Sequence, residues 1–276
     1  MAYLTPATRI LDQPTTFTYE NKTWTPANYE GRYEGMVSLR QALAHSLNAA
    51  TAKVGARIGM ERVVALWKSM GMASKLQPYP SLVLGAFEMT PLEVATAYAV
   101  IASGGYQVKP RLFTAIRDAK GKTIEIRIPD PQRVVHSQSA YLVTDMMRAV
   151  VDTGTGAPVR ARGFTAPAAG KTGTTNDKRD AWFVGFTPDL LAVVWVGFDD
   201  NESLGLSGAQ AALPIWTRFM KAATAGLPVA DFQAPEGITF ATIDPQSGLL
   251  AREGCPARDN QPFLEGTEPR ATCNLH

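Results

Sequence analysis

Two apolar, aromatic segments, 181–186 and 190–198, constrain the fold of this chain more than any other feature of its sequence. Only Thr187-Pro188-Asp189 separates them. A connection this short joins antiparallel strands, because parallel strands need a crossover of a dozen or more residues. The two segments therefore predict a β-hairpin, and they are the strongest strand pair in the sequence.

A glycine-lysine-threonine run, 169–175, lies just ahead of this strand pair. Gly170-Lys171-Thr172 invites comparison with a phosphate-binding loop, but that motif needs a glycine where Thr165 stands. A phosphate loop also has to open a helix, and two strands come next here instead. Nucleotide binding is therefore disfavoured.

The segment Lys171 to Thr175 is better interpreted as a strand that enters the same sheet. Alternation then places Thr172 and Thr174 on one face, with Lys171 and Gly173 on the other. A glycine in an edge strand permits close approach by another backbone, such as an extended peptide. A lysine beside hydroxyl groups suits a carboxylate. From this stretch alone, a solvated turn between strands stays an equal alternative.

The rest of the chain mixes helices with short strands. Capping boxes open two of the helices, at Ser38 and at Thr90. Helical patterns occupy 38–59, 61–70, 90–103, 137–151 and 214–223, and a hairpin is predicted over 111–128 with its turn at 118–121. The first 35 residues or so are predicted to be extended, and a Pro- and Gly-rich tail begins at Gly226. Without a regular βαβ rhythm, this pattern favours an α+β fold.

Composition narrows the possible partners. The formal net charge of the 276 residues is +2, and no long Lys/Arg run is present, so a nucleic-acid partner is not expected. No apolar stretch reaches the roughly 18 residues that a membrane span requires, and the opening residues lack the pattern of a signal peptide. The histidines are scattered and no CxxC is present, so neither a metal nor a cofactor is expected.

Cys255 and Cys273 both lie in the Pro- and Gly-rich tail. A disulfide there would supply the constraint that the tail lacks in apolar residues. Counting alone leaves a disulfide and two unrelated thiols equally open.

The residues that come after Lys171 carry a resemblance to a known family. The block 171–177, with 180–189 after it, resembles the class A penicillin-binding proteins, the bifunctional enzymes that polymerise and cross-link peptidoglycan. A lone Lys-Thr-Gly would be weak, but this longer block is specific. Further matches extend the resemblance over almost the whole chain: Ser38 to Asn48, Thr90 to Ala95, Gly154-Thr155-Gly156, Cys255-Pro256, 263–269 and Cys273.

Ser46-Leu47-Asn48 matches the family's Ser-x-Asn motif. By resemblance, Ser46 relays protons between two lysines, and Asn48 hydrogen-bonds an amide of the stem peptide. A purely structural role as mid-helix polar residues fits poorly, because both side chains compete with helical backbone hydrogen bonds. A loop between two helices suits them better.

The Lys-Thr-Gly motif supplies the remaining roles that the resemblance implies. Lys171 places positive charge near the serine hydroxyls. Thr172 and Thr174 hold the terminal carboxylate of the peptide, and the Thr174 amide forms half of an oxyanion hole. Gly173 leaves room for the ligand.

The family's first motif, Ser-x-x-Lys, is not present in this sequence. No serine has a lysine three positions later: Ser46 is followed by Ala49, and Ser137 by Ala140. Leu4 to Thr8 resembles the segment that comes after the Ser-x-x-Lys helix in the family. We therefore expect the chain to begin just after its nucleophile, as a fragment of a longer protein, and to be inactive alone because no acyl-enzyme forms.

The resemblance implies the penicillin-binding transpeptidase fold, an antiparallel sheet flanked by helices, with the opening strands and nucleophile helix missing. Residues 1–225 would form a truncated transpeptidase domain, and 226–276 a tail with a disulfide between Cys255 and Cys273. The implied activity is that of a serine-type D-Ala-D-Ala transpeptidase outside the cytoplasm, anchored to the inner membrane in the full-length protein. Its ligands would be stem peptides and β-lactams, and a partner chain could supply the missing strands.

Other functions stay open on the sequence. A carboxypeptidase or β-lactamase of the same fold is disfavoured by the long aromatic block and the two-cysteine tail. A module that binds peptidoglycan peptide without catalysis, or half of a split enzyme, is compatible with the absent serine. Catalysis by a Ser-His-Asp triad through His45 or His136 is disfavoured, because no nucleophile elbow is present.

Overall fold

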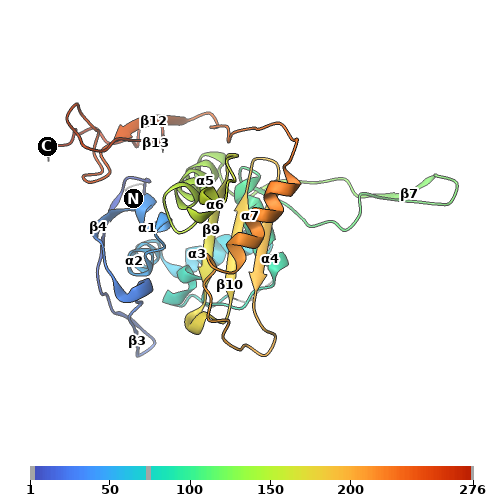
Figure 1. Ribbon diagram of the computed structural model, residues 1–276, viewed down its shortest axis with the longest axis horizontal. Helices are drawn as coiled ribbons and strands as arrows, with labels where there is room; N and C mark the ends of the chain where they lie inside the picture. Colours follow the sequence, from blue (N-terminus) through green and yellow to red (C-terminus); the bar gives the residue numbers. More distant parts are fainter. Residues whose placement is uncertain (1–3, 73–75, 275–276) are drawn as a thin grey trace.

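A three-stranded antiparallel sheet forms the middle of the molecule (Figure 1). The structure is a computed structural model that describes residues 4–72 and 76–274. The strands β9 (Ala169–Thr174), β10 (Ala181–Phe186) and β11 (Leu191–Val196) follow the order β11-β10-β9. The predicted hairpin is confirmed, and so is the strand that contains Lys171.

The turn between β10 and β11 is fixed by the threonine of the Thr-Pro-Asp link. The Thr187 amide donates to the Leu190 carbonyl at 2.9 Å, and the Leu190 amide donates to the Thr187 hydroxyl oxygen at 3.2 Å. Such a side-chain turn closes the two strands tightly. Across the sheet, Phe183 of β10 pairs with Val194 of β11 and with Thr172 of β9.

Helices cover both faces of this sheet. On one face, α7 (Ala212–Ala223) packs against β10 and β11. On the other, α4 (Pro91–Ala102) packs against β11, and α5 (Ser137–Asp152) against β9. Trp216 of α7 is fully buried against Phe183, whereas Phe186 lies in the opposite cluster with Met147 of α5. The result is the layered α+β arrangement that the sequence predicts.

The long helical pattern after Ser38 is divided in two. Ser38 caps α1 (Leu39–Ala44) through a capping box with Gln41, as predicted. The chain then leaves the helix at residues 45–47 and resumes in α2 (Asn48–Ile58), followed by α3 (Met60–Ser69). The interruption places the Ser-x-Asn residues at a turn between two helices, which is where the sequence favoured them.

The sequence predicts extended structure for the first 35 residues or so, and in the described part, residues 4–38, short strands and extended loops predominate. In this part β1 (Arg9–Asp12) pairs with β4 (Gly35–Ser38), and β2 (Phe17–Tyr19) pairs with β3 (Lys22–Trp24). A single 3-10 turn, η1 (Tyr29–Gly31), lies after β3. A second 3-10 segment, η2 (Pro80–Leu84), packs against α2 and α3.

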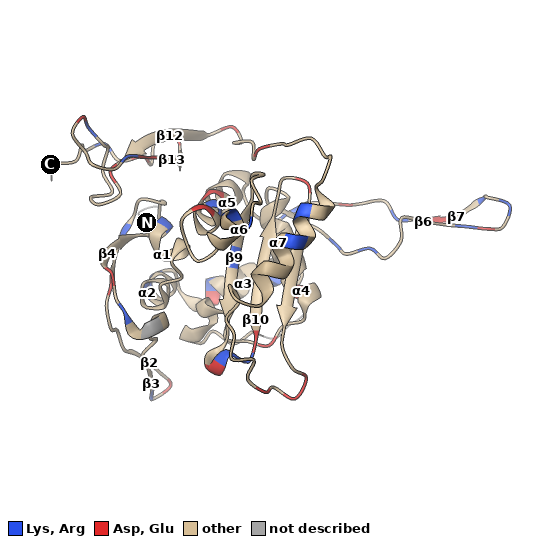
Figure 2. Cartoon of the chain, in the orientation of Figure 1, with Lys and Arg blue, Asp and Glu red and all other residues tan. Residues whose placement is uncertain are grey.

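A hairpin arm projects from the body of the molecule (Figure 1). Its strands are β6 (Ala115–Arg117) and β7 (Thr123–Ile126), near the predicted positions, and the two-stranded pair β5 (Tyr106–Gln107) and β8 (Gln132–Arg133) lies at its base. Charged residues of both signs lie along the arm (Figure 2). It takes no part in the sheet that carries Lys171.

The C-terminal segment folds into the hairpin β12 (Ile238–Ile243) and β13 (Asp259–Leu264). Ile243 and Phe263 are fully buried beside Ala7. Arg40 of α1 forms ion pairs with Asp145 of α5 and, at 3.3 Å, with Asp259 of β13. The C-terminal hairpin is therefore bound to the same helix that leads to Ser46.

The predicted disulfide between Cys255 and Cys273 is not formed in the structure, although both residues are buried. Each sulfur instead forms a hydrogen bond with a different neighbour. The Cys255 sulfur accepts a hydrogen bond from the Arg252 amide at 3.3 Å, and the Cys273 thiol bonds to Asp244. Burial acts to raise the pKa of Asp244, but hydrogen bonds from Cys273, Ser247 and backbone amides outweigh it and lower the pKa to about 2.

The core contact between α7 and the sheet provides a test of the fold. We expect Trp216→Ala to lower the free energy of unfolding by about 3–5 kcal/mol, because it leaves a cavity beside Phe183. It also removes the indole N–H that donates to the Gly185 and Ala192 carbonyls at 3.2 and 3.1 Å. Urea titration measures the change. Ile215→Ala, on the exposed face of the same helix, is the control and should cost far less; equal losses would contradict the packing of α7 on the sheet.

Candidate active site

Lys171 and Ser46, 125 positions apart in the chain, meet in the structure. The Lys171 Nζ donates to the Ser46 hydroxyl oxygen at 2.8 Å and to the Thr172 carbonyl at 3.0 Å. Lys171 extends from the edge strand β9, and Ser46 from the turn between α1 and α2. The two motifs that the sequence singled out are therefore joined by a direct contact.

Ser46 holds an unusual backbone conformation. Its φ is +56°, in the left-handed region that few residues other than glycine adopt. Backbone hydrogen bonds keep it there: the Ser46 amide donates to Leu43 at 3.2 Å, and the Leu47 amide donates to Ala42 at 2.9 Å. Strained serines of this kind cluster at functional sites. The turn holds the Ser46 hydroxyl next to the lysine of β9.

Asn48 is the first residue of α2, and its side chain is held by a segment that the sequence did not single out. Its Nδ2 donates to the Ala27 carbonyl at 2.8 Å. The neighbouring Asn28 accepts a hydrogen bond from the Ala49 amide at 3.0 Å and donates to Asp12 at 2.8 Å. These contacts hold the start of α2 against the segment that contains Ala27 and Asn28. No local sequence motif around Asn28 predicts these hydrogen bonds.

Burial of its amine changes the acidity of Lys171. Desolvation lowers the pKa of its ammonium group from 10.5 to about 8. Burial disfavours the charged form of a lysine, because its ammonium loses contact with water. A lysine with this pKa is able to give and take a proton close to neutral pH, as a general acid or base requires.

Thr172 and Thr174 share one face of β9, as alternation predicts, and each hydroxyl has a defined partner. The Thr172 and Thr155 hydroxyl oxygens lie 2.7 Å apart, and the Thr174 hydroxyl accepts a hydrogen bond from the Gly208 amide at 3.0 Å. Because that bond occupies a lone pair of Thr174, its own proton is available to another acceptor. Thr174 is exposed at the end of the strand.

The surroundings of Gly173 are close-packed. A Cβ placed on Gly173 would lie 3.1 Å from the Cβ of Trp182 in the neighbouring strand. Gly208 lies against the same strand pair: a Cβ there would be 2.4 Å from the carbonyl oxygens of both Gly173 and Trp182. Glycine at 208 is therefore required for the loop before α7 to reach Thr174. The sequence alone assigned no role to Gly208 or Thr155.

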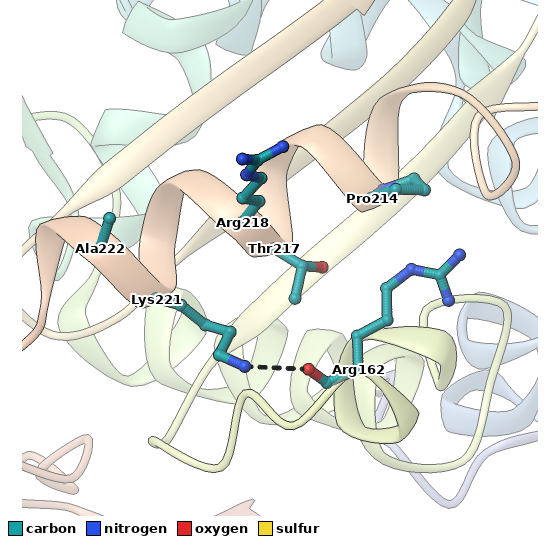
Figure 3. Close-up of a pocket in the computed structure, with 6 residues that line it drawn as sticks. All are labelled: Arg162, Pro214, Thr217, Arg218, Lys221 and Ala222. Atoms are coloured by element: carbon teal, nitrogen blue, oxygen red, sulfur yellow. Dashed lines mark hydrogen bonds between the residues drawn. The ribbon is translucent and has the colours of Figure 1, made fainter.

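A surface hollow of about 450 Å³ lies elsewhere (Figure 3). Arg162, Arg218 and Lys221 line it, and the Lys221 Nζ donates to the Arg162 carbonyl at 3.3 Å. The basic residues of α7, the helix that contains Arg218 and Lys221, are blue in Figure 2. None of the predicted site residues lines the hollow.

Over residues 4–72 and 76–274, no group of three or more His, Cys, Asp or Glu side chains is arranged to hold a metal ion. Over the same residues, every helix is too short or too polar to cross a membrane.

Comparisons with known proteins agree with this geometry. The penicillin-binding protein transpeptidase domain matches residues 3–221, and the C-terminal domain of penicillin-binding protein 1A matches residues 234–276. Penicillin-binding protein 1A of Aquifex aeolicus is 41% identical over 257 residues, 92% of this chain and 35% of that protein. The chain belongs to the class A penicillin-binding proteins.

Solved structures of the family share the fold. Penicillin-binding protein 1A from Haemophilus influenzae superposes with a TM-score of 0.90 at 28% identity, over 98% of this chain and 46% of that one. Penicillin-binding protein A from Mycobacterium tuberculosis, solved as a penicillin G acyl-enzyme complex, gives 0.62 at 25% identity, over 79% and 56%. The chain thus spans less than half the length of its 1A relatives and carries their transpeptidase fold.

The lowered pKa of Lys171 predicts how stability depends on pH. Between pH 8 and 10.5 the unfolded chain binds a proton at Lys171 that the folded chain does not, so stability rises with pH. Relative to Lys171→Met, the wild type should gain about 2 kcal/mol of unfolding free energy from pH 7 to pH 10. Urea titrations of both proteins at the two pH values measure this difference. The contributions of the other titratable groups are common to both proteins and cancel. A difference that stays constant with pH would show that Lys171 titrates normally.

Proposed function

We propose that this chain is the part of a D,D-transpeptidase that binds the stem peptide during peptidoglycan cross-linking in cell-wall synthesis. The observation that carries the proposal is the hydrogen bond from the Lys171 Nζ to the Ser46 hydroxyl. It joins the second and third motifs of the family in one site. Membership of the class A penicillin-binding proteins supports the same reaction class.

The residues divide the work between proton transfer and binding. Lys171, with its pKa lowered to about 8, exchanges a proton with Ser46, which passes it on toward the reacting serine and the departing D-alanine amine. Such relayed proton transfer allows an amine to leave in neutral form. The Asn48 Nδ2 donates to the Ala27 carbonyl, so we propose that its Oδ1 accepts the hydrogen bond from an amide of the stem peptide.

Recognition of the peptide's acidic end falls to β9. The Thr174 hydroxyl keeps its proton for an acceptor, because the Gly208 amide occupies an oxygen lone pair. Together with Thr172 and the positive charge of Lys171, it suits the terminal carboxylate of D-Ala-D-Ala. The Thr174 amide is proposed as half of the oxyanion hole. Gly173 has no side chain, and so it leaves room for the peptide beside the strand.

The attacking serine is not among these residues. Residues 1–276 contain no Ser-x-x-Lys, and without a nucleophile no covalent acyl-enzyme forms. We therefore propose that the isolated chain binds stem peptide reversibly but does not transfer the acyl group. Reversible binding without catalysis, or complementation as half of a split enzyme, is the alternative function that this absence favours.

The same family membership supports β-lactams as ligands, since penicillin G acylates Mycobacterium tuberculosis penicillin-binding protein A in its solved complex. It also supports a location outside the cytoplasm with an inner-membrane anchor in the full-length protein. Within the chain we propose a transpeptidase unit over 1–225 and a separate tail over 226–276. A partner chain that completes the sheet next to β11 belongs to the same proposal.

Covalent labelling tests the absence of a nucleophile. We expect the purified chain to remain unlabelled by a fluorescent penicillin after denaturing electrophoresis, because the β-lactam ring has no serine to open it. A penicillin-binding protein with an intact Ser-x-x-Lys is the positive control. A covalent band on this chain would refute the proposal of reversible binding alone.

Peptide binding tests the carboxylate site. The chain should bind a peptide that ends in D-Ala-D-Ala more tightly than the same peptide with its C-terminus amidated. Thr174→Val should weaken binding of the peptide with the free carboxylate about 5-fold, which is the effect of one lost hydrogen bond. Its affinity for the amidated peptide should not change. Calorimetry measures both affinities. Thr165→Val is the control, because Thr165 is exposed and lies outside the site. If the wild-type chain bound the free and the amidated peptide equally well, the proposed carboxylate site would be contradicted.

A further inference from the structure

The Gly154-Thr155-Gly156 motif has no role in the proposed mechanism, yet it lies directly behind the site. It comes after the end of α5 and precedes the short helix α6 (Pro158–Ala161). The Thr155 amide donates to the Ala44 carbonyl at 3.0 Å, and the Thr155 hydroxyl lies 2.7 Å from that of Thr172. One residue therefore bonds to both segments that form the site.

The first of these bonds is possible because Gly154 has no side chain. A Cβ on Gly154 would lie 2.1 Å from the Ala44 carbonyl oxygen and 3.0 Å from the Cα of Val150. Neither neighbour is able to yield, because both are backbone atoms of packed helices. Glycine at 154 thus brings the loop against the last residue of α1, two positions before Ser46.

The contacts close into a ring. From Ser46 the ring runs back along the turn to Ala44, crosses to Thr155, passes to Thr172 and returns through Lys171 to the Ser46 hydroxyl. We propose that Thr155 is a positioning residue that sets the distance between the Ser46 turn and β9. The proposal rests on the function proposed for Ser46 and Lys171.

The Ser46 turn and β9 are each held in place by separate contacts. The start of α2, just after the Ser46 turn, is held by Asn28, which in turn bonds to Asp12, and β9 is held by β10. These two supports belong to different parts of the molecule. Thr155 connects them next to the reacting groups, where a shift of about 1 Å is enough to reduce catalysis strongly.

The test uses Thr155→Val, which keeps the shape of the side chain and removes its hydroxyl. We expect the Lys171 pKa to rise from about 8 toward 10.5, because a loosened turn admits water to its ammonium group. NMR titration of ¹³C-labelled lysine, assigned with Lys171→Arg, measures it. Affinity for the D-Ala-D-Ala peptide should fall about 5-fold. Thr155→Ser keeps the hydroxyl and should restore both values.

Thr153→Val is the matched control, since the Thr153 hydroxyl donates only within its own helix, to Ala149 at 3.1 Å. It should change neither the Lys171 pKa nor the affinity. Gly154→Ala, which displaces Ala44 directly, should raise the Lys171 pKa as Thr155→Val does. If Thr155→Val and Gly154→Ala both leave that pKa unchanged, the positioning role is wrong. Because the pKa is read without any ligand, failure of the wild type to bind peptide would overturn the proposed function and not this inference.

Discussion

The contact between the Lys171 ammonium and the Ser46 hydroxyl is the interaction on which the site depends. It requires an edge strand that carries the lysine, a turn in a left-handed conformation that carries the serine, and burial of the lysine's amine. Each requirement is met by a different part of the fold. Because desolvation lowers the pKa of the lysine to about 8, the geometry that brings the two groups together also gives an amine that is able to exchange a proton near neutral pH.

Local patterns in the sequence were sufficient to predict the elements that carry the site. Alternation around Lys171 placed Thr172 and Thr174 on one face of a strand, and the pairing of β9 with β10 agrees. The capping box at Ser38 fixed the start of α1, since its hydrogen bonds lie within one turn. Ser46 and Asn48 were favoured at a turn because their side chains compete with helical hydrogen bonds. These signals act over a few residues, and so they are visible in the sequence.

The supports behind the site depend on tertiary contacts and could not be predicted in the same way. Asn28 bonds to Ala49, 21 positions away, and nothing near Asn28 in the sequence marks it. Thr155 lies in a motif that indicates only a glycine-rich loop, because its partners, Ala44 and Thr172, come from distant segments. The disulfide expected in the tail is absent for a similar reason: Cys273 bonds to Asp244, a contact that counting cysteines does not reveal.

The position of β9 in the sheet links this site to the shape of its proposed ligand. In the described part of the chain β9 pairs with β10 alone, and its Lys171 side chain contacts the Ser46 turn. An extended peptide that adds to an open strand edge gains main-chain hydrogen bonds, and side groups then decide which peptide fits. On β9 these groups are Lys171, which contacts the Ser46 hydroxyl, and Thr174, which lies at the end of the strand. The proposed ligand, a peptide that ends in D-Ala-D-Ala, has a free carboxylate that suits the Thr174 hydroxyl, which the Gly208 amide holds in place with a hydrogen bond of 3.0 Å.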